Sequence, residues 1–140
     1  MVDHRLVQRK LLQLHERISQ LQSFRLRTYR EFKKIPYPKA VEKLLQELIE
    51  ICIDIGKHIL ADEQWGVANE AREIFSILQQ KKVLSAAQCR QLQQMAGFRN
   101  LLVHLYEKID EEIVFGIYRK RLGDFTKFSQ TIEKFLRRKS

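Results

Sequence analysis

Apolar residues recur at intervals of three and four along most of the chain, which is the spacing that places side chains on one face of an α-helix. The segment from about Asp3 into the Arg30 region follows this pattern at Leu6, Val7, Leu11, Leu14, Ile18 and Leu21. The segment from about Lys39 to Ala61 follows it at Val41, Leu44, Leu45, Leu48, Cys52, Ile55 and Ile59. Two prolines separate these predicted helices, because proline disfavours helix in the residue before it.

Three further helices are predicted in the second half of the chain. The first is short and spans about Val67 to Gln80. Ser85 and Gln88 have the spacing of a capping box and should begin the next helix. Asp110 is placed to cap the last helix, which two glycines should weaken or bend, Gly116 and Gly123. Five helices with short connections predict an all-α fold, an antiparallel bundle.

Composition supports a folded helical protein. The 140 residues are 44% hydrophobic and 31% charged with only five glycines, a balance that excludes a disordered chain. We expect one domain over residues 1–140. No run of residues is apolar and long enough for a signal peptide or a membrane span, so we expect a cytoplasmic protein with no membrane partner. Cys52 and Cys89 are then expected to be reduced core residues.

The chain is strongly basic, with 26 lysines and arginines against 17 acidic residues and a formal charge of +9. This charge favours a polyanionic partner such as nucleic acid, an acidic protein or an anionic membrane. Charge alone does not separate these partners, and it also serves solubility.

Residues 99–106 combine the side chains with the clearest chemistry. Arg99 carries a permanent positive fork that suits phosphate. His104 can give or take a proton near neutral pH, and Tyr106 adds a hydroxyl and a stacking face. Together these side chains suit binding or cutting a phosphodiester.

Helix geometry sets a condition on that site. At about 100° per residue, Arg99 and Tyr106 lie on one face, whereas His104 lies roughly 140° away from Arg99. The three side chains converge only if the helix breaks near Val103 or a second copy of the chain completes the site. The alternative is that Arg99 and His104 are ordinary, partly buried polar residues of a core helix.

The second predicted helix carries a smaller polar cluster. Glu50, Asp54 and His58 follow one another at i,i+4 steps, a spacing that can present ligands to one metal ion. No second helix repeats the pattern, so we favour no metal. Asp54 and His58 are expected to form a local pair or to line a cleft with residues 99–106.

The string from Arg99 to Tyr106 fits the R-X4-H-X-Y signature of HEPN domains. The wider sequence resembles the HepT-like branch of that superfamily, with matches in residues 41–59, around Phe75 and Leu78, and from Gly97 to Asn100. The resemblance covers most of residues 4–136. It implies a helical HEPN-like homodimer in which the two motif segments face one cleft.

The same resemblance implies an activity and a site. HepT-like proteins are metal-independent endoribonuclease toxins of type VII-like toxin–antitoxin systems, which need no cofactor. Arg99 would bind the scissile phosphate of RNA and His104 would be the general acid and base. Asn100 would support the phosphate or the histidine, with Asp54 and His58 as further supporting residues.

Tyr106 carries a second implication of the resemblance. In the family, a small MntA-like nucleotidyltransferase is the antitoxin, and it transfers AMP from ATP to the motif tyrosine. AMP on Tyr106 would block the cleft and offset its positive charge. Two alternatives remain: a non-catalytic helical module that binds nucleotide or RNA beside a nucleotidyltransferase, and a basic structural RNA-binding protein in which the motif only stabilises a dimer.

Overall fold

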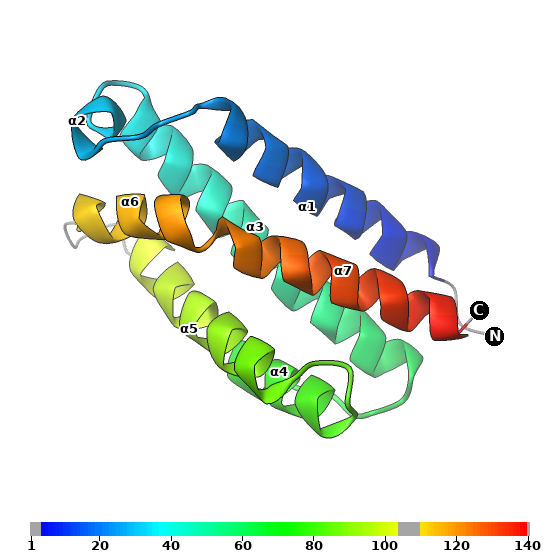
Figure 1. Cartoon of the computed structure of the whole chain (residues 1–140). Coiled ribbons are helices and arrows are strands. Elements are labelled where there is room, and N and C mark those ends of the chain that lie inside the picture. The colour runs from blue at the N-terminus through cyan, green and yellow to red at the C-terminus, as the bar shows by residue number, and fades with distance from the viewer. Residues whose placement is uncertain (1–3, 104–109, 140) are drawn as a thin grey trace.

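The computed structural model describes residues 4–103 and 110–139, and all regular structure in these ranges is helical. Figure 1 shows long antiparallel helices packed lengthwise, with α3 between α1 and α5. The predicted all-α fold is confirmed. The elements are α1 (Arg5–Ser23), α2 (Tyr29–Phe32), α3 (Tyr37–Asp62), α4 (Ala71–Gln80), α5 (Ala86–Val103), α6 (Glu111–Lys120) and α7 (Leu122–Lys139).

Helix α3 is the centre of the bundle because its apolar residues extend round most of its circumference. It packs against α1, α4, α5, α6 and α7. Its buried apolar residues are Val41, Leu44, Leu45, Leu48, Ile49, Ile51, Cys52, Ile53, Ile55, Ile59 and Leu60. Helix α1 buries a single stripe instead, formed by Val7, Leu11, Leu14, Ile18 and Leu21. Leu6 was predicted in that stripe but is 39% exposed.

The first helix is shorter than predicted. It ends at Ser23, and the backbone of Arg25 has a φ of +51°, which an α-helix cannot contain. Thr28 and Glu31 then form a capping box that begins α2. The hydrogen bond from the Thr28 hydroxyl lowers the pKa of the Glu31 carboxyl. The prediction of one helix into the Arg30 region was therefore wrong.

The last predicted helix is two helices. Arg121 separates α6 from α7, with a φ of −118° and a ψ of 0° that lie outside the helical range. Its side-chain Nε donates to Asp124 Oδ2 at 2.6 Å, which holds the two helices at the break. The predicted bend therefore occurs between the two glycines.

Other predicted boundaries agree more closely. Ser85 Oγ accepts from the Gln88 backbone N–H at 3.1 Å, and Gln88 Oε1 accepts from the Ser85 N–H at 3.2 Å, which confirms the capping box before α5. The third predicted helix begins at Ala71 rather than near Val67.

Gly56 lies where α3 packs tightly against α4. A Cβ added there would lie 2.5 Å from Ile74 Cγ2, and Ile74 is fully buried and so cannot move aside. Alanine normally stabilises a helix relative to glycine by about 1 kcal/mol, but overpacking costs about 1–3 kcal/mol. We expect Gly56→Ala to lower the free energy of unfolding by up to about 2 kcal/mol in urea titrations.

Gly116 supplies the matched control, because nothing lies within 4 Å of a Cβ added to it. Gly116→Ala in α6 should raise the free energy of unfolding. A gain from both substitutions would show that α3 and α4 can separate at little cost.

Two further sequence expectations concern thiols and membranes. Cys52 and Cys89 are free and buried, and burial raises the pKa of both thiols, as expected for reduced core residues. Within residues 4–103 and 110–139, no helix is both long and apolar enough to cross a bilayer.

Candidate active site at the end of α5

The site is built on the last two turns of α5. Met95, Ala96, Phe98 and Leu102 are buried and fix this part of the helix against the core. Arg99 is half-buried and Asn100 is exposed, as their separation of about 100° round the helix requires. Core packing therefore positions the backbone of both motif residues, with the Arg99 side chain half-buried and the Asn100 side chain exposed.

The guanidinium of Arg99 has an unusual environment. Its Nε atom is buried, and among the described side chains it is the one buried polar atom without a hydrogen-bond partner. Buried donors in folded proteins are almost always paired, because an unpaired one costs about 1–3 kcal/mol. No hydrogen bond at Nε ties this side chain to the core, and a phosphate or carboxylate is the acceptor that a guanidinium fork fits.

The other two motif residues, His104 and Tyr106, lie outside the described residues. Helix α5 is described as far as Val103. The convergence of Arg99, His104 and Tyr106, through a break in the helix or a second copy of the chain, therefore stays a prediction.

Asp54 and His58 are not bonded to the site residues that the structure describes. The Asp54 carboxylate pairs with Lys10 Nζ on α1 at 3.4 Å, on a different side of α3 from α5 (Figure 1). Neither Asp54 nor His58 forms a hydrogen bond or ion pair with the other, so the predicted local pair is wrong. Their supporting role stays a prediction.

The spacing of Glu50, Asp54 and His58 on α3 also allowed a metal site. Glu50 Oε1 accepts from Gln46 Nε2 at 3.1 Å. In the described part of the chain, no three His, Cys, Asp or Glu side chains are grouped so that they could hold an ion.

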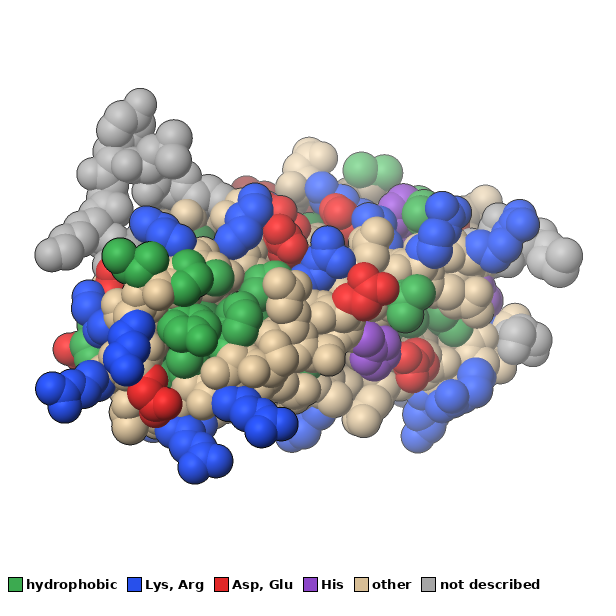
Figure 2. Space-filling model, turned by 90° about the horizontal axis from the view of Figure 1, so that it is seen from above, with side chains coloured by type: hydrophobic (Ala, Val, Ile, Leu, Met, Phe, Trp, Pro, Cys, Tyr) green, Lys and Arg blue, Asp and Glu red, His purple; other side chains and the backbone are tan. Residues whose placement is uncertain are grey.

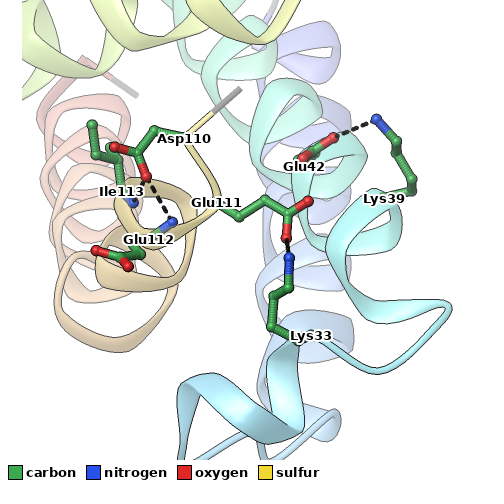
Figure 3. Close-up of polar contacts among 7 residues, drawn as sticks. All are labelled: Lys33, Lys39, Glu42, Asp110, Glu111, Glu112 and Ile113. Carbon is green, nitrogen blue, oxygen red and sulfur yellow. Dashed lines mark hydrogen bonds and ion pairs between the residues drawn. The ribbon is translucent and has the colours of Figure 1, made fainter. Parts of the chain in front are cut away.

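On the far side of residues 104–109, the start of α6 is fixed by polar contacts. Figure 3 shows Asp110 Oδ1 accepting from the backbone N–H of Glu112 at 2.9 Å, which confirms the predicted cap. Lys33 donates to Glu111, and this hydrogen bond raises the pKa of Lys33. The described residues on either side of 104–109 are therefore held in place, by the core packing of α5 and by the capped, ion-paired start of α6.

Several residues near the site carry no motif signal. Glu42, in the second turn of α3, is only 8% exposed and pairs with the exposed Lys39 at 3.5 Å (Figure 3). The position of Glu42 among the apolar residues of α3 could have indicated from the sequence that its carboxylate is buried. Leu101 and Ile113, which flank residues 104–109, are 48% and 47% exposed, although apolar side chains in a helical bundle normally face its core.

The end of the molecule that carries α2 and α6 has a distinct surface. Figure 2 shows hydrophobic side chains gathered there, with lysines and arginines around them. Half-buried rings at this end include Phe24, Tyr29, Tyr37 and Phe115. Tyr29 and Phe115 contact each other with ring centroids 5.9 Å apart. Apolar surface ringed by cations is typical of an interaction surface for another macromolecule.

Comparisons with known proteins identify relatives. The family model described as "Ribonuclease HepT-like" matches residues 14–132. The chain is 34% identical over 89 residues to the mRNA nuclease HepT of Shewanella oneidensis, covering 64% of this chain and 67% of that protein. It is 32% identical over 95 residues to the tRNA nuclease HepT of Aphanizomenon flos-aquae, covering 68% and 65%. The matched segments thus span about two thirds of the curated relatives.

A solved structure extends the likeness to nearly the whole chain. The tri-AMPylated Shewanella oneidensis HEPN toxin, in complex with MNT antitoxin, superposes with a TM-score of 0.86 at 26% identity. The superposition covers 94% of this chain and 99% of that one. The resemblance inferred from residues 99–106 is confirmed at the level of the family: the chain belongs to the HepT-like ribonucleases.

Proposed function

We propose that this protein is the toxin of a type VII-like toxin–antitoxin system and a metal-independent endoribonuclease. The observation that carries the proposal is the buried, unpartnered Nε of Arg99 within an R-X4-H-X-Y sequence. Membership of a family whose relatives are named mRNA and tRNA nucleases supports RNA as the substrate. The formal charge of +9 supports a polyanionic substrate as well, and we place the activity in the cytoplasm.

In the proposed reaction, Arg99 binds the phosphate that is cut and stabilises the charge that develops on its oxygens. His104 acts as general base on the 2′-hydroxyl and as general acid toward the departing 5′-oxygen. The 2′-oxygen forms a bond to phosphorus as the bond to the 5′-oxygen breaks. The products are a 2′,3′-cyclic phosphate and a 5′-hydroxyl, and no metal or cofactor takes part.

Asn100 is proposed to assist this reaction from the adjacent position on α5. Its exposed amide can donate to a phosphate oxygen or orient His104. Asp54 and His58 are retained as supporting residues, although Asp54 pairs with Lys10 on α1.

Tyr106 is proposed as the site at which the toxin is neutralised. An MntA-like nucleotidyltransferase would transfer AMP from ATP to its hydroxyl, with pyrophosphate leaving. The solved relative named as a tri-AMPylated toxin in complex with an antitoxin supports this assignment. The added phosphate and nucleoside would occupy space two residues from His104 and offer the Arg99 guanidinium an acceptor in place of RNA.

We further propose that the active form is a homodimer. Leu101 and Ile113, each about half exposed, flank residues 104–109 and would be buried by a second copy of the chain. A second copy also removes the geometric difficulty that one straight helix cannot bring Arg99 and His104 together.

The test is a cleavage assay on total cellular RNA in EDTA, with protein shown by intact mass to be unmodified at Tyr106. We expect discrete fragments that end in 2′,3′-cyclic phosphates. After incubation with the partner nucleotidyltransferase and ATP, the mass should rise by AMP and the cutting should stop, whereas Tyr106→Phe should gain no AMP. An absence of cutting by the unmodified protein would contradict the nuclease proposal and favour a binding module.

A further inference from the structure

A polar hollow lies at the opposite end of α5 from Arg99, where the turn between α4 and α5 meets the second half of α7. Its volume is about 460 Å³. We call it the Trp65 pocket, and it is lined by Trp65, Lys81, Lys82, Val83, Thr131, Lys134, Phe135, Arg138 and Lys139. None of the sequence motifs discussed above includes these residues.

The Trp65 pocket concentrates positive charge. Five of its nine lining residues are lysine or arginine and none is acidic. Lys139 pairs with Glu63 at 3.3 Å, but no other cation of the pocket has a carboxylate partner in the described part of the chain. A cation near a helix C-terminus stabilises the helix by about 0.3–1 kcal/mol through the helix dipole. That effect does not explain why five cations face one hollow, where they repel one another. An anionic ligand would relieve this repulsion.

Aromatic rings order part of this charge. The ring centroids of Trp65 and Phe135 are 6.0 Å apart. Lys81 Nζ lies 5.7 Å from the Trp65 centroid, and Lys139 Nζ lies 5.7 Å from that of Phe135. Cation–π contacts of this kind restrict the lysine side chains, so the pocket presents charge at defined positions.

The cations of α7 form a row rather than a single point. Lys134 and Arg138 are four residues apart, which places them on one face of α7 with about 6 Å between them along the axis, and Thr131 lies one turn earlier on the same face. Lys81 and Lys82 face this row from the end of α4. An extended row of this kind fits successive charges along a polyanion better than one small anion.

We propose that the Trp65 pocket binds the phosphate backbone of the RNA substrate at a distance from the cut. The inference rests on the proposed function. Gln88 Nε2 donates to Thr131 Oγ1 at 2.8 Å and so connects the pocket to the first turn of α5. Arg99 is eleven residues beyond Gln88, about 16 Å along the helix axis. Only an RNA long enough to span this distance can occupy both places.

The experiment measures RNA affinity in a His104→Ala background, which prevents cleavage during titration. Lys134→Ala/Arg138→Ala removes two exposed cations of the pocket. Lys43→Ala/Lys57→Ala is the matched control, because both lysines are exposed on α3 and line none of the described hollows. Fluorescence anisotropy is recorded for a tRNA-length RNA and for a short RNA, a dinucleotide that cannot reach from Arg99 to the pocket, over a range of salt concentrations.

We expect the pocket variant to bind the long RNA about tenfold more weakly, with the slope of log K against log salt reduced by about 1.4 for two lost contacts. The control should keep the wild-type affinity and slope, and neither variant should change binding of the short RNA. Equal affinity and slope for the long RNA in both variants would overturn the inference. The pocket would then bind another anionic partner, such as an acidic protein, and not RNA. When His104 is intact, Lys134→Ala/Arg138→Ala should still cut the short RNA at the wild-type rate. The two proposals therefore fail in different ways: if the nuclease proposal is wrong, the wild type itself cuts no RNA.

Discussion

Replacing Arg99 by alanine should reduce the rate of RNA cleavage by about 10²–10³-fold and leave the protein as stable as the wild type. The loss of rate follows because the neighbouring Asn100 amide is neutral and cannot supply the positive charge that the guanidinium brings to the phosphate. Stability should survive because the buried Nε has no hydrogen bond to lose. Removing a buried, unpaired polar atom also removes its desolvation cost. Initial rates on total RNA and urea unfolding of the same preparation measure both effects.

Two further substitutions serve as controls for Arg99→Ala. Arg90→Ala removes an exposed arginine from the same helix and should alter neither the rate nor the stability. Arg99→Lys keeps the charge but loses the planar fork, so it should recover only part of the lost rate. A fall of several kcal/mol in the stability of Arg99→Ala, with proportionate loss of activity, would assign Arg99 to the core and not to the reaction.

Truncating Phe128 should give the largest loss of stability, about 3–5 kcal/mol for Phe128→Ala. The side chain is fully buried on α7, and its ring meets the ring of Phe75 on α4 edge to face, with centroids 6.4 Å apart and planes at 85°. The substitution loses the transfer free energy of the ring, leaves a cavity that surrounding helices cannot fill, and removes an aromatic pair. Chemical unfolding followed by circular dichroism measures the change.

Thermal unfolding should show the same loss of stability for Phe128→Ala. For a chain of this size, each kcal/mol lowers Tm by roughly 2–4 °C, so the expected fall is on the order of 10 °C. Leu12→Ala is the control, because Leu12 lies on the outer face of α1 and is 59% exposed. A loss below about 1 kcal/mol for Phe128→Ala would mean that α7 can close over the cavity.

Local signals predicted much of the fold. The three- and four-residue spacing of apolar positions located α1 and α3, because one face of each must be buried. Side-chain caps located other boundaries, since the Ser85 and Asp110 side chains satisfy backbone donors within their own turns. Such features depend on neighbours in sequence, and the sequence therefore contains them.

The errors in the fold have a common origin. The end of α1 depends on Arg25 adopting a left-handed backbone without a glycine to signal it, although Thr28 and Glu31 three residues apart were a readable sign that a new helix begins. The break at Arg121 likewise carries no proline. Apolar spacing continues across both breaks, so periodicity alone joins the helices on either side.

For the candidate site, too, the sequence predicted some features and not others. Its residues followed from a sequence motif, and their roles stay a prediction. Their environment did not follow, because burial of Arg99 Nε and Glu42 depends on how α3 and α5 rotate against the core. Asp54 shows the limit most clearly: its partner, Lys10, is 44 residues away on another helix, and no local spacing could select it over His58.

The burial of both native thiols has a practical consequence. Cys52 and Cys89 are 1% and 3% exposed, so a maleimide dye should react with neither in the folded protein. A cysteine placed at Ala87, which is exposed in the first turn of α5, would then be labelled selectively without removing either native one. Energy transfer between donor- and acceptor-labelled copies would test the proposed homodimer and, if it forms, report how far apart its two α5 helices lie.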